Sequence, residues 1–176
     1  RRFSPDGPVE LIRADVLHLP LRRSFDLAVA ANGVFSHLLR DRERLRALRQ
    51  LRDRLRPGGS VLVDAFWLSR RRRSECASPE GHRRSRTLRG PNGPLEVLER
   101  RVCDPETARC RVRYRYRHPD GSTERAESVL RFWTETEVRR LFPEAGLRLT
   151  ATWGGYDRSG WSPDSRRLVV RARRPG

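Results

Sequence analysis

The side chains best suited to chemistry follow two predicted strands near the start of the chain. Asp15 comes after an apolar stretch that begins at Val9, and Asn32 follows the small apolar run of residues 27–31. In an open α/β sheet, ligands bind just outside the carboxyl ends of the strands. A carboxylate there can accept a hydrogen bond from a ligand amino group, and small residues such as Ala31 let a ligand approach the backbone. This pattern predicts a ligand site at the two strand ends.

A possible proton acceptor lies just past the second strand. His37 carries an imidazole, the side chain that most often exchanges protons near neutral pH, and it would act as a general base. Simpler roles stay open for all three residues. Asp15 would cap the following turn, Asn32 would form a turn with Gly33 because both tolerate positive φ, and His37 would start a helix or fill the core.

Several aromatic side chains are candidates for the walls of a substrate pocket. They supply contact area and, for a cationic amine or sulfonium, a favourable π face. Core packing is the competing explanation for the tryptophans. The segment W-G-G-Y-D at 153–157 lies in a long loop where a core needs no residue, so Tyr156 and Asp157 are the favoured substrate contacts. The aromatic candidates are Phe35, Trp67, Trp133, Tyr156 and Trp161.

The first half of the chain predicts a parallel α/β unit. Residues 25–31 and 60–67 read as strands buried on both faces of a sheet. Between them, residues 41–55 repeat leucine at helical spacing, with Asp41 as the N-cap and residues 57–59, P-G-G, as the end. Strand, helix and strand in this order give two parallel neighbours joined by a right-handed crossover.

The second half begins with alternating, antiparallel patterns. Residues 69–93 are predicted to form a flexible loop, and residues 95–133 three antiparallel strands. The middle strand alternates arginine with Cys110, Val112, Tyr114 and Tyr116, so one of its faces is arginine, and Glu124 and Glu127 are expected to pair with that face.

A helix and two strands are expected at the end of the chain. Thr134 and Glu137 form a capping box that starts the helix. Residues 147–153 and 167–173 are the last strands, with a long loop between them.

The composition is strongly basic but uses one basic residue. The formal net charge is +17, and all 39 basic residues are arginine. Such charge normally indicates a nucleic-acid partner, but a GC-rich coding bias explains arginine without lysine, and we favour that explanation.

Three cysteines without a C-x-x-C pair argue against a disulfide framework and a zinc site. No apolar run is long enough for a signal peptide or a membrane span, so a cytoplasmic location is expected.

The order of these motifs resembles the class I S-adenosylmethionine-dependent methyltransferases. The resemblance is carried by Asp15 after a strand, F-D opening the next strand, L-R-P-G-G before the third, and F-W-T-x-x-E followed by E-A-G-L. It implies a Rossmann-like, mostly parallel sheet with an antiparallel last strand and an inserted antiparallel meander. The implied segments are residues 1–68 and 134–176 for the core, and residues 69–133 for an insertion on the substrate side or at a homodimer interface.

The resemblance also implies roles for individual residues. S-adenosylmethionine would be the cofactor, with Asp15 on the adenine amino group and Val16 against the ring. Ala30, Ala31 and Asn32 would line its methionine end.

The glycine-rich cofactor loop of this family does not precede Asp15. The chain is therefore expected to be a fragment truncated at its N-terminus, with an exposed sheet edge and weak cofactor binding. The expected reaction is methyl transfer to a nitrogen or oxygen of a small molecule. Two alternatives stay open: methylation of RNA or protein with arginines steering an acidic partner, and a non-catalytic remnant that serves dimerisation.

Overall fold

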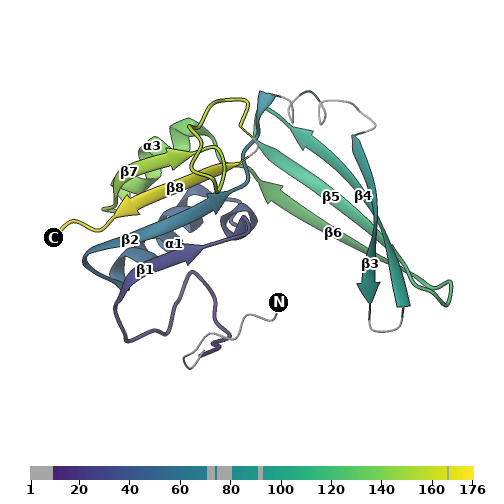
Figure 1. Ribbon diagram of the computed structural model, residues 1–176, viewed down its shortest axis with the longest axis horizontal. Helices are drawn as coiled ribbons and strands as arrows, with labels where there is room; N and C mark the ends of the chain where they lie inside the picture. Colours follow the sequence, from purple (N-terminus) through teal and green to yellow (C-terminus); the bar gives the residue numbers. More distant parts are fainter. Residues whose placement is uncertain (1–9, 71–73, 75–80, 91–92, 166) are drawn as a thin grey trace.

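The computed structural model describes residues 10–70, 74, 81–90, 93–165 and 167–176. They form two four-stranded sheets (Figure 1). The first is mixed and lies against two helices, and the second is an antiparallel meander that extends away from it. The α/β fold class predicted from the sequence is confirmed, including the antiparallel last strand.

The mixed sheet has the strand order β1-β2-β8-β7. It is built from β1 (Phe25–Ala30), β2 (Leu55–Ala65), β7 (Arg148–Trp153) and β8 (Leu168–Arg173). β1 and β2 are parallel, as predicted, with Ala28 opposite Val61. β8 runs antiparallel between β2 and β7. The carboxyl ends of β1 and β2 therefore lie side by side at one edge of the sheet.

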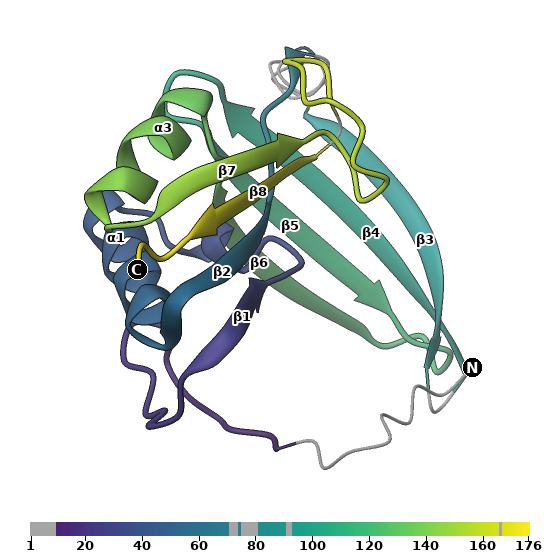
Figure 2. The same cartoon turned by 60° about the vertical axis from the view of Figure 1, so that its left-hand side comes forward.

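Helices α1 (Asp41–Asp53) and α3 (Glu135–Glu144) cover the same face of this sheet (Figure 2). The main core lies between them and the sheet, because their apolar stripes face the strands. Its fully buried members include Leu48, Leu55, Val61, Trp133 and Phe142.

On the sheet face opposite the helices, β1 is exposed, and its outer edge has no neighbouring strand among the described residues. Leu27 is 55% exposed and Val29 is 54% exposed, so the prediction that β1 is buried on both faces was wrong. The predicted strand ending at Asp15 is also absent, because residues 10–14 adopt no strand and do not pair with β1. The small apolar residues of β1 suit a central strand, but the described chain places no neighbour on its outer side.

The antiparallel sheet has one more strand than the sequence predicted. Its strands are β3 (His82–Gly90), β4 (Gly93–Asp104), β5 (Arg109–Arg117) and β6 (Thr123–Arg131). β3 falls in the segment predicted to be a loop, and it forms because residues 82–90 pair along their whole length with β4.

Two details of this sheet differ from the predictions. Glu127 pairs with Arg113 at 2.8 Å, but Glu124 lies opposite Tyr116 and pairs with His118. Residues three apart in a strand point to opposite faces, so both glutamates cannot meet the arginines. Cys103 and Cys110 face each other across β4 and β5 and form a disulfide. The argument against disulfides therefore failed, because strand register had made these two cysteines neighbours.

The predicted helix boundaries were partly right. Thr134 is the N-cap of α3, with the reciprocal bonds to Glu137 that a capping box requires, and Gly146 follows the helix at φ 76°. Asp41, however, is not the N-cap of α1. Arg40 occupies that position, and its N–H donates to the Glu43 carboxylate at 3.0 Å. α1 also ends at Asp53, because β2 already begins at Leu55.

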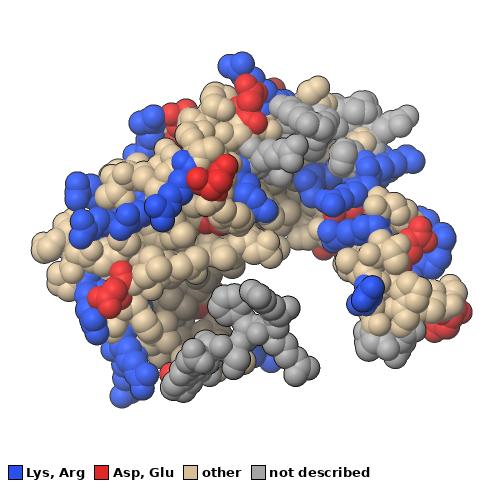
Figure 3. Space-filling view, in the orientation of Figure 1, with Lys and Arg blue, Asp and Glu red and all other residues tan. Residues whose placement is uncertain are grey.

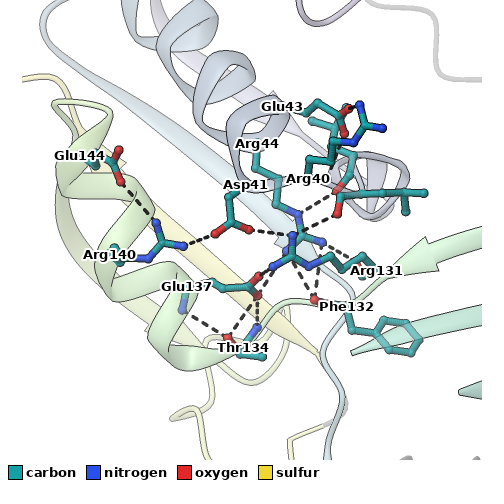
Figure 4. Close-up of polar contacts among 12 residues, drawn as sticks. Arg40, Asp41, Glu43, Arg44, Arg131, Phe132, Thr134, Glu137, Arg140 and Glu144 are labelled. Atoms are coloured by element: carbon teal, nitrogen blue, oxygen red, sulfur yellow. Dashed lines mark hydrogen bonds and ion pairs between the residues drawn. The ribbon is translucent and has the colours of Figure 1, made fainter. Parts of the chain in front are cut away.

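A buried arginine joins the helices to the meander (Figure 4). The Arg44 side chain has no solvent exposure, and it forms an ion pair with Glu137 at 3.3 Å. Its Nε donates to the Leu38 carbonyl at 3.0 Å, and its Nη2 donates to the Arg131 carbonyl at 2.5 Å. The guanidinium also lies 4.5 Å from the centre of the Trp133 ring. One side chain of α1 thus fixes the end of β6 and the start of α3.

Burial makes the charged form of Arg44 less stable. Loss of solvent lowers the pKa of the Arg44 guanidinium from its ordinary value to about 10, although the Glu137 carboxylate opposes that change. At about 1.4 kcal/mol per pKa unit, keeping the cation costs on the order of 3 kcal/mol. Its partners must therefore stay in place for the chain to fold.

We predict that Glu137→Gln destabilises the protein by about 3 kcal/mol, because the variant leaves a buried guanidinium without its carboxylate. Glutamine keeps the length of the side chain at the third helix position. Urea unfolding measures the loss. The matched control is Glu135→Gln, which removes an exposed ion pair with Arg139 on the same helix and should change stability by less than about 0.5 kcal/mol. Equal effects of the two variants would contradict this prediction.

Acid should weaken the same junction through Asp41. Burial raises the pKa of the Asp41 carboxyl, but the Arg131 and Arg140 guanidiniums outweigh burial and hold that pKa below its usual value of 3.8. A carboxyl with a lowered folded-state pKa stabilises the protein above its unfolded-state pKa, and that contribution is lost as the pH falls. The free energy of unfolding should therefore decline from about pH 5 to pH 3 less steeply in Asp41→Asn than in the wild type. Urea titrations at each pH test this, with Asp53→Asn as control for the loss of one acid from α1, and parallel curves for Asp41→Asn and wild type would refute it.

Candidate functional site

The site is built where the parallel strands β1 and β2 end. β1 ends at Ala30, and the chain then turns through Asn32 at φ 56° and Gly33 at φ 68°. The predicted turn with two positive φ angles is confirmed. Ala31 and Asn32 are exposed at this edge, whereas Ala30 is buried.

A buried carboxylate of β2 holds this turn. Asp64 is only 3% exposed. Its Oδ2 accepts the Asn32 N–H at 3.2 Å, and its main-chain carbonyl accepts the Gly33 N–H at 3.2 Å. Both left-handed residues are therefore bonded to the same residue of the neighbouring strand.

The long loop between β7 and β8 reaches the same carboxylate. The Tyr156 hydroxyl donates to Asp64 Oδ2, and Arg167 Nη1 lies 3.1 Å from Oδ2 and 3.3 Å from Oδ1. The Arg167 guanidinium also lies 4.8 Å from the centre of the Tyr156 ring. The hydrogen bond to Asp64, with some burial, raises the pKa of Tyr156 above 10.0. The Tyr156 side chain thus brings the predicted substrate loop to the predicted cofactor end of β1.

Gly33 is required by packing as well as by its backbone angle. A Cβ at this position would lie 2.8 Å from the Phe66 ring, closer than carbon atoms approach in proteins. Phe66 follows β2 and packs against Phe132 after β6. The turn therefore sits directly on the connection between the two sheets.

The residues after the turn divide between surface and core. His37 ends the short 3-10 helix η1 (Val34–His37) and is exposed. Phe35 is 1% exposed and packs on Trp133, with ring centres 5.9 Å apart. Phe35 and Trp133 are therefore core residues and cannot wall a substrate pocket, because no side of either ring is open.

Trp67 and Trp161 hold the long loop in place. Their rings meet edge to face at 5.0 Å, and the Trp67 Nε1–H donates to the Pro163 carbonyl at 3.2 Å. Trp67 is buried in the main core. Trp67 thus anchors the loop that carries Tyr156, and its place in the wall of a substrate pocket stays a prediction.

Asp157 serves the loop itself. Its Oδ1 accepts the Ser159 N–H at 3.1 Å and the Ser159 hydroxyl at 2.8 Å. These bonds lower the pKa of the Asp157 carboxyl. The neighbouring Tyr156 is 64% exposed, so its ring remains open to a ligand while its hydroxyl is bound.

Asp15 lies in an exposed turn instead of at a strand end. Its carboxylate accepts the Leu17 N–H at 2.9 Å, and this bond is the main cause of the lowered pKa of Asp15. The turn is fixed on α1 through Arg46, which donates to the Leu17 carbonyl at 3.1 Å. Val16 packs against the core. Among the described residues, no hydrogen bond or ion pair joins Asp15 to Asn32. The Asp15 turn is held by α1, and the Asn32 turn is held by β2.

A cavity lies beside Tyr156 on the face of the mixed sheet opposite the helices. Its volume is about 450 Å³, and its lining includes Leu27, Leu62, Trp153 and Val169. No group of three potential metal ligands is found among the described residues. In that part of the chain, no helix is both long and apolar enough to cross a membrane.

Sequence reasoning missed Asp64 and Arg167. A signal was present, because an aspartate inside the apolar strand S-V-L-V-D-A-F-W needs a partner when buried. The identity of its partners could not be read from the sequence, since Tyr156 and Arg167 lie 92 and 103 residues away.

Comparisons with known proteins bear on the fold. Residues 1–59 match the family model described as a methyltransferase domain. No curated protein matches the chain. Ninety-seven chains of solved structures do match it.

Three of these structures are similar over 93% of this chain. The CcbJ methyltransferase from Streptomyces caelestis has 21% identity and a TM-score of 0.72, with 62% of its own chain covered. An S-adenosylmethionine-dependent methyltransferase from Clostridium acetobutylicum has 11% identity, a TM-score of 0.73 and 63% coverage. The sugar N-methyltransferase KedS8 from Streptoalloteichus has 20% identity, a TM-score of 0.71 and 61% coverage.

This chain thus spans slightly less than two thirds of each of these proteins. At these identities the likeness concerns the fold. The chain has the fold of the S-adenosylmethionine-dependent methyltransferases, and its first third matches their methyltransferase domain.

Proposed function

We propose that this protein transfers a methyl group from S-adenosylmethionine to a nitrogen or oxygen atom of a small molecule. The observation that carries the proposal is the turn at Asn32 and Gly33, open at the carboxyl end of β1 and bonded to β2. Ligands of open α/β sheets bind at such an edge. The family match of residues 1–59 includes this turn.

Residues at this edge, and in the separate turn at Asp15, would fit different parts of the cofactor. Ala31 and Asn32 are exposed and small enough to leave the backbone open, which suits the methionine end. The exposed Asp15 carboxylate has an acceptor oxygen for the adenine amino group, with Val16 beside it. When bound, S-adenosylmethionine supplies a methyl group on a positively charged sulfur.

Two side chains, Tyr156 and His37, would act on the acceptor molecule. The exposed Tyr156 ring offers a surface for a substrate next to Asn32, because its hydroxyl is held on Asp64. His37 is exposed just past the turn and would take the proton that the acceptor atom releases. A sugar amine is the acceptor class we favour, since KedS8, which has the same fold, is a sugar N-methyltransferase.

A second candidate is methylation of an acidic macromolecule. A hollow of about 860 Å³ in the antiparallel sheet is lined by arginines from four strands. They include Arg84, Arg113, Arg115 and Arg125. Binding of such a partner would weaken steeply with added salt, whereas binding of a neutral small acceptor would not.

We predict that Asp15→Ala weakens binding of S-adenosylmethionine about tenfold, which is the loss of one hydrogen bond of about 1.4 kcal/mol. Isothermal titration calorimetry measures the change. The control is Asp26→Ala, which removes an exposed carboxylate paired with Arg56 at the amino end of β1. Unchanged affinity in Asp15→Ala would reject Asp15 as a cofactor ligand.

We predict that His37→Ala lowers kcat by about 10²-fold near neutral pH, the lower end of the range for a general base. The loss should shrink at higher pH, where an amine acceptor is deprotonated before it reacts. Methyl transfer from labelled cofactor, followed across pH, tests this. A uniform loss at every pH would mean that His37 is not the proton acceptor.

A further inference from the structure

Asp64 connects two segments that are remote in the sequence. Its carboxylate accepts hydrogen bonds from the Asn32 main chain on one side, and from Tyr156 and Arg167 on the other. The first segment is the proposed cofactor end of β1, and the second is the loop that carries the proposed substrate contact. No other residue in the described chain is bonded to both.

We propose that Asp64 is a positioning residue that sets the cofactor turn and the acceptor loop in one fixed arrangement. This inference rests on the proposed function, because it assigns Asp64 to the same site. Asp64 lies beneath the site and acts through Asn32 and Tyr156.

The turn depends on Asp64 because both of its backbone N–H groups are bonded to that residue. Asn32 has φ 56°, a left-handed conformation that asparagine tolerates better than most residues. The Asp64 carboxylate accepts the Asn32 N–H, and the Asp64 main-chain carbonyl accepts the Gly33 N–H. Without the Asp64 carboxylate, the Asn32 N–H loses its partner, and the bond that holds Asn32 on β2 is lost.

Asp64 holds the loop near its start, through Tyr156, and at its end, through Arg167. Between these two residues the loop is held independently of Asp64, because the Pro163 carbonyl accepts the Trp67 indole N–H. Loss of the Asp64 carboxylate would therefore release Tyr156 and Arg167 while the loop stays attached. The release should alter the position of the acceptor more than the stability of the fold.

The first test needs no methyl transfer. Hydrogen–deuterium exchange compares the amide of residue 32 in the wild type and in Asp64→Ala, which removes both side-chain acceptors and leaves the main-chain bond to Gly33 in place. We expect exchange about tenfold faster in the variant. Spectrophotometric titration of tyrosine should also show the pKa of Tyr156 falling toward 10.0, because its bond to Asp64 is the main cause of the raised value. Asp26→Asn, at the opposite end of β1, is the control and should change neither.

The second test is a double-mutant cycle in methyl transfer, with Asp64→Ala and Tyr156→Phe. If Asp64 positions Tyr156, each variant lowers kcat by about tenfold or more with little change in KM, and the double variant is no slower than Asp64→Ala alone. Losses that multiply in the double variant would show that the two residues act separately, and would overturn the proposal.

The two tests separate failure of this inference from failure of the proposed function. Unchanged exchange at residue 32 in Asp64→Ala overturns the inference whether or not methyl transfer is found. Faster exchange with wild-type kcat also overturns it, because a mobile turn would then not matter for the reaction. If the wild type transfers no methyl group to a sugar amine, the proposed function fails, and with it the positioning role of Asp64 in that reaction.

Discussion

The structure depends on one buried charge, the guanidinium of Arg44. It lies where α1, α3 and the end of β6 meet, and its hydrogen-bond donors point to groups from three separate parts of the chain. Because an unpaired cation in that position would be costly, the three parts can come together in few ways. The junction that results places the meander at the carboxyl end of the mixed sheet, next to the turn after β1 (Figure 1).

A second buried charge, the Asp64 carboxylate, joins two segments of the chain. It accepts hydrogen bonds from the Asn32 main chain and from the Tyr156 hydroxyl, and it forms an ion pair with Arg167. Arg44 is surrounded by carbonyl oxygens and an aromatic ring and lies wholly inside the protein, whereas Asp64 is bonded to exposed residues. Arg44 therefore defines how the two sheets are joined, and Asp64 defines the edge at which a ligand would bind.

The surface of the molecule is uneven in polarity. Arginine side chains gather on the meander and along the left-hand edge of the molecule, with uncharged surface between them (Figure 3). On the meander, several arginines are matched by glutamates, such as Arg113 with Glu127 and Arg117 with Glu96. On the face of the mixed sheet opposite the helices, β1 carries the exposed apolar side chains Leu27 and Val29. Apolar side chains on a β-strand with an open edge favour association with another polypeptide.

The sequence alone determined the local elements and their order. The capping box at Thr134, the turn at Asn32 and Gly33, and the parallel pairing of β1 with β2 follow from short-range patterns of residue type, because they depend on backbone preference and periodicity. Register and partners were decided only by the tertiary structure. Whether Glu124 meets an arginine, whether Cys110 meets Cys103, and what Asp64 binds all depend on contacts between distant segments, and a one-residue change of register reverses them.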